Sequence, residues 1–134
     1  MPTSVVAKSK NASPALRFRA KIWLEVAGDS VFCHGLRQML LAVETTGSIK
    51  AAAAQIGRSY RFVWARIKSA EQALGATLVK TQVGGTGTRR SELTAVARNL
   101  VATFDDLQQR IIELTSEAFE KRIQPTLGQR NPPL

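Results

Sequence analysis

The sequence predicts an α+β fold, with a short β-hairpin, three helices, a second hairpin and a long final helix. Three observations indicate this order. Glycine and serine mark helix boundaries in the middle of the chain, a glycine-rich stretch separates two strand-like segments, and a long apolar repeat runs towards the end. The 134 residues carry a net charge of +9 and are 44% hydrophobic, so the chain can bury a core. Such a basic chain favours an anionic partner, either nucleic acid or an acidic membrane surface.

The first 18 residues are predicted to form a disordered basic arm. They contain Pro2 and Pro14, several Ser and Asn residues, and no apolar periodicity. No stretch resembles a membrane span or the apolar core of a signal peptide, so we expect no membrane partner and a cytoplasmic location. Cys33, the single cysteine, fits a reducing compartment. With one cysteine and one histidine there is no metal-ligand spacing, and we expect no metal and no cofactor.

Residues 19–124 are predicted to form the folded domain, which begins with a β-hairpin. The segment 19–26 is rich in strand-forming residues, 27–30 reads as a turn, and Val31-Phe32 can return as a second strand. We expect Trp23 to pack under this hairpin.

Three helices are predicted after the hairpin, and small residues mark their boundaries. Each helix ends at a glycine that can adopt the left-handed conformation: Gly47, Gly57 and Gly75. Hydroxyl side chains that can cap a helix begin the second, third and last helices: Ser48, Ser59 and Thr94. The second helix, 49–56, is mostly alanine, which lets another helix approach closely.

The second and third helices have the order of a helix-turn-helix, in which the third helix, about 59–74, lies in the major groove of DNA. Its core face is expected to consist of Val63, Ile67, Ala70 and Leu74, with Trp64 beside them. Arginine can donate two hydrogen bonds to guanine, and tyrosine can reach a phosphate or a base. The predicted DNA-contacting residues of the two helices are Ser48, Lys50, Ser59, Tyr60, Arg61, Phe62, Ala65, Arg66 and Ser69. The alternative is an ordinary solvated basic face.

The distribution of charge favours DNA over that alternative. Residues 47–90 contain eight Lys and Arg residues and one acid, Glu71, whereas residues 91–124 contain four bases and six acids. Positive charge is therefore concentrated in the predicted helix-turn-helix and in the segment that follows it.

Residues 78–93 are predicted to form a β-hairpin wing that contacts the DNA backbone. A strand at 77–83 is followed by a glycine-rich loop at 84–90 and a short return strand at 91–93. Donors to phosphate are expected at the tip of this wing: Thr86, Thr88, Arg89 and Arg90. The loop lacks the Gly-Lys-Ser/Thr ending of a nucleotide-binding loop and does not lead directly into a helix, which disfavours a nucleotide site.

The last helix, predicted at 94–124 and followed by a flexible tail at 125–134, contains an unbroken apolar repeat that starts at Ala97. Its seven positions alternate in steps of three and four residues, as in a coiled coil. We expect the beginning of this stripe to pack on the domain and the part from Phe104 to Leu114 to be exposed and to pair across a two-fold axis. The predicted dimer contacts are Leu100, Phe104, Leu107, Ile111, Leu114 and Ala118.

Several short motifs resemble the N-terminal domain of the molybdate-responsive regulator ModE family. They are Gly47-Ser48-Ile49, Ala51 to Ala54, Ile56-Gly57, Ser59-Tyr60, Val63-Trp64, Gly84-Gly85 with Gly87, and Leu93-Thr94. A wider resemblance to LysR-type DNA-binding domains rests on Leu74-Gly75, Leu78-Val79 and Leu93-Thr94. The resemblance covers about residues 20–120 and implies a winged helix-turn-helix whose long last helix pairs across a two-fold axis. It also implies DNA contacts at Ser59, Tyr60, Arg61, Ala65 and Arg66.

The sequence therefore predicts a bacterial-type transcriptional regulator that binds double-stranded DNA as a homodimer. The alternative is a DNA-binding or adaptor subunit whose long helix pairs with a separate effector-sensing protein. No acid–base or metal set is apparent, so an enzyme is not expected. ModE proteins continue into molybdate-binding domains, which have no counterpart up to Leu134, and we expect no tight molybdate binding by this chain.

Overall fold

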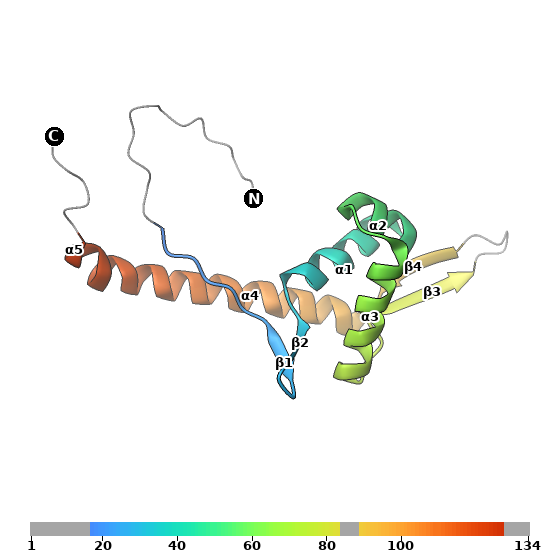
Figure 1. The fold of residues 1–134 in the computed structure, drawn as a ribbon, viewed down its shortest axis with the longest axis horizontal. Helices are drawn as coiled ribbons and strands as arrows, with labels where there is room; N and C mark the ends of the chain where they lie inside the picture. Colours follow the sequence, from blue (N-terminus) through green and yellow to red (C-terminus); the bar gives the residue numbers. More distant parts are fainter. Residues whose placement is uncertain (1–16, 84–88, 128–134) are drawn as a thin grey trace, which may run out of the picture. The chain divides into compact units, whose positions relative to one another are not determined.

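The computed structural model describes residues 17–83 and 89–127 (Figure 1). The elements in chain order are β1 (Leu24–Val26), β2 (Asp29–Phe32), α1 (His34–Thr46), α2 (Ile49–Ile56), α3 (Tyr60–Leu74), β3 (Val79–Val83), β4 (Arg89–Leu93), α4 (Ala95–Ala118), a π-helical turn (Phe119–Ile123) and α5 (Gln124–Thr126). This order confirms the predicted α+β winged helix-turn-helix with an N-terminal β-hairpin and a long C-terminal helix. The predicted disordered arm and flexible tail lie mostly outside the described residues.

The contacts of the chain separate two units, and each is described by itself. The larger unit, residues 21–109, contains both hairpins, the three short helices and the beginning of α4. The smaller unit combines the end of α4 and the residues after it with the N-terminal residues up to Ala20. In the described residues no helix is both long and apolar enough to cross a membrane.

The first hairpin is shorter than predicted. β1 begins at Leu24, and the turn contains only Ala27 and Gly28, with φ of +53° and +88°. Positive φ at both central residues is typical of the two-residue turn that matches the twist of a hairpin. The expectation that Trp23 packs under the hairpin is wrong: the side chain is 51% exposed, and its indole N–H donates to the Glu25 carboxylate at 2.7 Å. Strands this short leave too little surface to cover an indole.

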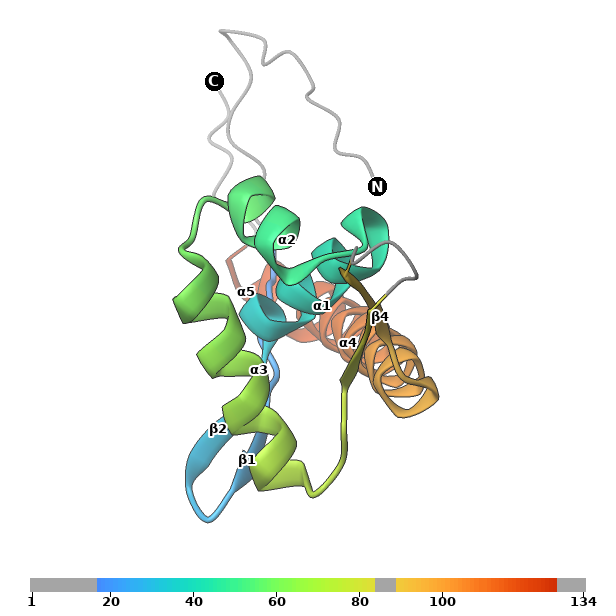
Figure 2. The ribbon, with the colours of Figure 1, turned by 90° about the vertical axis from the view of Figure 1, so that its right-hand side faces the viewer.

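The predicted helix caps are confirmed. The hydroxyls of Ser48, Ser59 and Thr94 each accept a hydrogen bond from the backbone N–H three residues later, at 2.9, 3.0 and 3.1 Å. The glycines that end α1, α2 and α3 have φ between +68° and +81°, a left-handed conformation that L-residues with a side chain disfavour. These caps fix the two turns that orient α2 and α3 (Figure 2).

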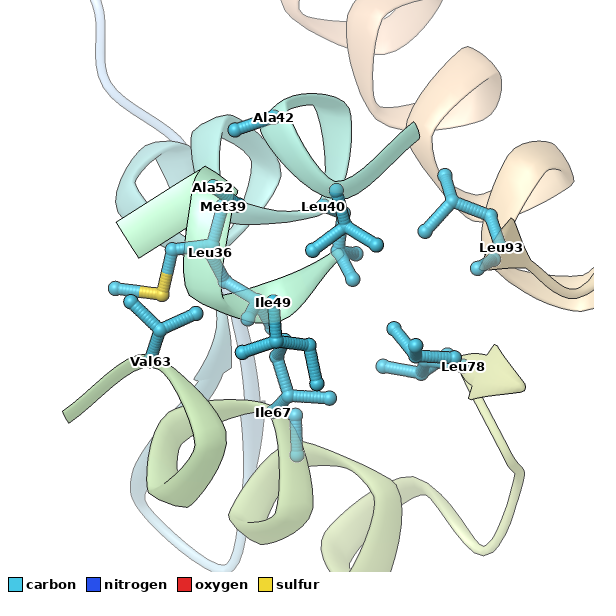
Figure 3. Packing of buried hydrophobic residues seen from close by; sticks show 14 of the residues in the cluster. Leu36, Met39, Leu40, Ala42, Ile49, Ala52, Val63, Ile67, Leu78 and Leu93 are labelled. Carbon is cyan, nitrogen blue, oxygen red and sulfur yellow. The ribbon is translucent and has the colours of Figure 1, made fainter. Parts of the chain in front are cut away.

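The core lies where α1 packs against α2, α3 and the base of the wing (Figure 3). Leu36 and Leu40 of α1 are fully buried, as are Val63 of α3 and Leu78 before β3. The predicted core face of α3 is confirmed, with Val63, Ile67 and Ala70 buried and Leu74 half-buried.

The wing is an antiparallel pair in which Val79 lies opposite Leu93 and Val83 lies opposite Arg89. The return strand therefore starts at Arg89 rather than at residue 91, and the placement of Arg89 and Arg90 in the loop is corrected. Cross-strand pairing with Val83 and Gln82 explains the difference, because a partner strand extends a ladder beyond what local propensity indicates. The backbone N–H of Ser91 donates to the Gly47 carbonyl at 2.7 Å, which joins the wing to the turn between α1 and α2.

In the larger unit, the beginning of α4 is buried more extensively than the repeat alone predicts. Ala97, Val101 and Phe104 are buried, and the Phe104 ring lies 5.0 Å from the Phe32 ring. The expectation that Phe104 is exposed is therefore wrong, because β2 supplies an aromatic partner within the chain. Leu100 is half-buried and Leu107 is 47% exposed.

Two ion pairs connect α1 to α4. The Arg37 guanidinium pairs with Asp105, and the Arg98 guanidinium pairs with Glu44 at 2.9 Å. Both pairs lie beside the buried stripe of α4 and hold this helix against α1.

In the smaller unit, the α-helix ends at Ala118 and a π-helical turn replaces the predicted continuation to Gln124. Phe119 is buried, with its ring 5.9 Å from that of Phe18. Ile111 is half-buried, Ala118 is exposed, and Leu114 is 67% exposed.

Candidate nucleic-acid interface

The solvent-facing side of α3 collects most of the predicted DNA-contacting residues of this helix. The side chains opposite the buried face are exposed: Arg61, Phe62, Ala65 and Ser69. The cap at Ser59 places Arg61 and Phe62 in the first turn of the helix. Tyr60 is also exposed and lies on the flank towards the wing. A helix that enters the major groove uses its N-terminal residues to contact base edges.

The two arginines of α3 differ in their surroundings. Arg66 is half-buried, and its guanidinium donates to the Cys33 sulfur at 3.6 Å, between β2 and α1. Arg61 is exposed and makes no ion pair within the described residues. Arg61 therefore has the greater freedom to donate both guanidinium nitrogens to a base.

Trp64 was expected in the core, and this expectation is wrong. The side chain is 43% exposed, and the Lys68 ammonium lies 5.8 Å from the centroid of its ring. The neighbouring position, Val63, takes the core site, so Trp64 points towards the wing instead. Tyr60 is four residues earlier, which places both rings on the same flank of α3.

An open hollow of about 830 Å³ lies between α3, the start of α2 and the wing. Its polar and aromatic lining consists of Ser48, Lys50, Tyr60, Trp64, Lys68, Thr81 and Ser91. The sequence prediction omitted four of these residues: Trp64, Lys68, Thr81 and Ser91. Helical spacing could have indicated Lys68, which follows Trp64 by four residues, but the approach of β3 to α3 depends on the tertiary fold.

The hydroxyls of Ser48 and Ser59 already accept the helix-capping hydrogen bonds described above. A hydroxyl that accepts one hydrogen bond can still donate its proton, so either serine can reach a phosphate oxygen. Lys50 is exposed in the first turn of α2 and makes no ion pair among the described residues. The N-terminus of α2 also carries a partial positive charge from the helix dipole.

The wing residues divide into two groups. Thr86 and Thr88 lie outside the described residues, and so does the side chain of Arg89. Arg90 is exposed, and its guanidinium lies 3.7 Å from the position that a Cβ on Gly47 would occupy. Arg90 therefore lies beside the turn that precedes α2, and its predicted place at the wing tip is corrected.

Two acidic residues near this surface have basic partners. Glu71 pairs with Lys68 at 3.2 Å, and Glu44 pairs with Arg98. The Arg98 guanidinium holds the pKa of the Glu44 carboxyl below its ordinary value of 4.5, and a hydrogen bond from the Leu93 N–H acts in the same direction. In the part of the chain that the structure describes, no three His, Cys, Asp or Glu residues are grouped to hold a metal ion.

Part of the chain is similar to known regulatory proteins. Residues 36–100 match the family described as bacterial regulatory helix-turn-helix protein, lysR family. The chain is 37% identical over 75 residues to the molybdenum transport protein ModE of Herbaspirillum seropedicae, a match that covers 56% of this chain and 28% of that protein. It is 32% identical over 85 residues to the molybdenum-pterin-binding protein MopB of Rhodobacter capsulatus. This match covers 63% of this chain and 31% of that protein. The chain thus spans less than a third of these relatives.

Solved structures of similar chains include ArgP from Mycobacterium tuberculosis, with 29% identity, a TM-score of 0.42, and coverage of 64% of this chain and 29% of that chain. The protein chain of a CbnR DBD–DNA complex has 22% identity and a TM-score of 0.45, and the match covers 69% of this chain and 95% of that chain. The sequence matches confirm the resemblance to the helix-turn-helix domain of ModE and LysR-type regulators. The matched family is described as regulatory, in agreement with the class of protein that the sequence analysis predicts.

Proposed function

We propose that this chain binds specific sequences of double-stranded DNA as a homodimer and regulates transcription, because residues 36–100 match the lysR family of bacterial regulatory helix-turn-helix proteins. Helix α3 lies in the major groove, and the wing contacts the phosphate backbone. The observation that carries the proposal is the exposed first half of α3, where Arg61 has no ion-pair partner among the described residues.

The surroundings of α3 support contact with the DNA backbone. Lys50 at the start of α2 and Lys68 of α3 line the hollow beside α3, and Arg90 lies beside the turn that precedes α2. Phosphate contacts of this kind position a protein on DNA and make its affinity salt-dependent, while contacts to base edges determine sequence preference.

The apolar stripe on α4 supports the homodimer. Within the larger unit Leu107 is 47% exposed, and within the smaller unit Leu114 is 67% exposed. Apolar side chains repeated along one helix face leave a stripe that water does not solvate well. A two-fold pair of such helices gives two copies of α3, and the DNA site is then an inverted repeat.

DNA binding is tested by selecting preferred duplexes from a random pool and measuring affinity for selected and random DNA at several salt concentrations. Arg61→Ala should reduce the preference for the selected site. Arg122→Ala removes the same charge in the smaller unit and serves as the matched control, with the preference unchanged. An equal preference in wild type and Arg61→Ala would contradict the role given to α3.

The homodimer is tested by sedimentation at micromolar concentration. Leu107→Glu places a charge in the stripe, where burial against a partner is costly, and should yield folded monomers. Val96→Glu changes an apolar side chain of the same helix that is 53% exposed but lies off the repeat, and should leave the dimer intact. A wild-type monomer would instead favour the alternative function, in which α4 pairs with a separate effector-sensing protein.

A further inference from the structure

On the side of α3 opposite its buried face, Phe62 exposes an aromatic ring among basic or small side chains. Phe62 is 40% exposed and is the third residue of the helix. Its backbone N–H is the group that donates to the Ser59 hydroxyl, so the cap fixes the direction in which the side chain leaves the backbone. An isolated exposed apolar side chain is common on protein surfaces, and exposure alone assigns no role.

A second contact holds the Phe62 ring in place. The guanidinium carbon of Arg58 lies 4.8 Å from the ring centroid. The backbone N–H of Arg58 donates to the Ala53 carbonyl at 2.9 Å, which fixes the residue at the end of α2. A cation over an aromatic ring is favourable and limits the rotation of the ring. The exposed part of Phe62 therefore has a defined position.

Ala65 continues this apolar surface along the helix. It is exposed and follows Phe62 by three residues, a spacing that places both side chains on the same side of α3. Arg61 is adjacent to Phe62 in the same turn. The base edges in the major groove offer one apolar group to such a surface, the C5-methyl of thymine.

We infer that Phe62 contacts a thymine methyl group in the major groove, on the side of α3 that it shares with Ala65. The preferred DNA site then contains a thymine at a fixed position next to the base that Arg61 contacts. This inference rests on the proposed function and adds the kind of base that the helix selects.

The test uses the full chain and the duplex selected from random DNA. Each thymine of the site is replaced in turn by deoxyuridine, which lacks only the C5-methyl. We expect the wild type to lose affinity about 4-fold at one position of each half-site, the effect of removing one buried methyl group. Phe62→Ala should show no such loss at that position, and Phe62→Leu, which keeps an apolar contact, should show part of it.

Gln72→Ala is the matched control, because Gln72 is exposed later on the same helix, outside the predicted DNA-contacting residues, and its substitution should leave the deoxyuridine effect unchanged. Circular dichroism melting checks that each variant folds. If no thymine matters while the site is still preferred over random DNA, the inference is overturned and the proposed function stands. A deoxyuridine effect that persists in Phe62→Ala also overturns it, since another side chain then makes the contact. A chain that selects no DNA sequence overturns both.

Discussion

The two halves of α3 differ in how many partners they have within the chain. In the second half, Glu71 accepts hydrogen bonds from the backbone N–H groups of Leu78 and Val79, at 2.8 and 3.1 Å, and pairs with Lys68. In the first half, Arg61 and Ala65 are exposed and contribute no comparable contact. The second half therefore holds the wing, while the first half is available to a ligand. The predictions below test this division.

The largest expected effect is on stability, from Glu71. Glu71→Ala leaves the N–H groups of Leu78 and Val79 without their carboxylate acceptor, and the free energy of unfolding should fall by about 2–4 kcal/mol. Glu71→Gln keeps an acceptor and should lose less. Urea denaturation measures both, with the exposed neighbour Gln72→Ala as the control at about 0.5 kcal/mol or less. Equal stability of Glu71→Ala and wild type would contradict the proposal that the second half of α3 stabilises the wing.

Substitution of Arg61 should weaken DNA binding and leave stability nearly unchanged, the reverse of the effect expected for Glu71. Arg61→Ala should weaken binding to the selected DNA site by about 1–3 kcal/mol, because a bidentate contact to a base is lost. Its unfolding free energy should change by no more than about 0.5 kcal/mol. Arg66→Ala should weaken binding less, since one guanidinium nitrogen of Arg66 already donates to Cys33. Urea denaturation and DNA titration of the same preparations separate the effect on stability from the effect on binding. A destabilised Arg61→Ala variant would contradict the difference between the two halves of α3.

Glu44 holds the other strand of the wing and gives a smaller, pH-dependent effect. Because Arg98 and the Leu93 N–H lower the pKa of Glu44 below 4.5, the ionised carboxylate stabilises the fold above the unfolded pKa. This contribution is lost as the pH falls through the folded pKa. The melting temperature of wild type should exceed that of Glu44→Gln above about pH 5, and the difference should shrink towards about pH 3. A constant difference across this range would show that ionisation of Glu44 is not involved.

Molybdate should have the smallest effect. The exposed cations near α3 and the α2 N-terminus attract anions, but surface sites of this kind hold a small dianion only weakly. Calorimetric titration should detect no binding tighter than millimolar. Micromolar binding would show that the unpaired cations form a specific site for a small anion instead of a DNA-binding surface.

The sequence predicted the local features of the fold because they depend on nearby residues. The hydroxyls of Ser48, Ser59 and Thr94 cap helices by accepting from the backbone N–H three residues later. Gly47 ends α1 because glycine adopts a positive φ without strain. Such interactions act within a single turn, so residue type and position are sufficient to predict them.

Predictions that depended on distant partners were less successful. Phe104 lies in the core because Phe32, far away in the sequence, packs against it. Arg90 belongs to a strand because Gln82 lies opposite, and Trp64 lies exposed beside the hollow that the wing residues Val79 and Thr81 help to line. The apolar repeat of α4 indicated which residues share a face, but it could not indicate which of them the chain itself covers.

The hydrogen bond between the Ser91 N–H and the Gly47 carbonyl has a consequence for the order of folding. Glu71 and Leu78 are close in sequence and can meet early, since short loops close at low entropic cost. The contact between residues 47 and 91 closes a much longer loop, and such contacts slow folding. The return strand should therefore dock after Glu71 has bound the beginning of β3. The Ser91 amide should become protected from hydrogen exchange later during refolding than the Leu78 amide.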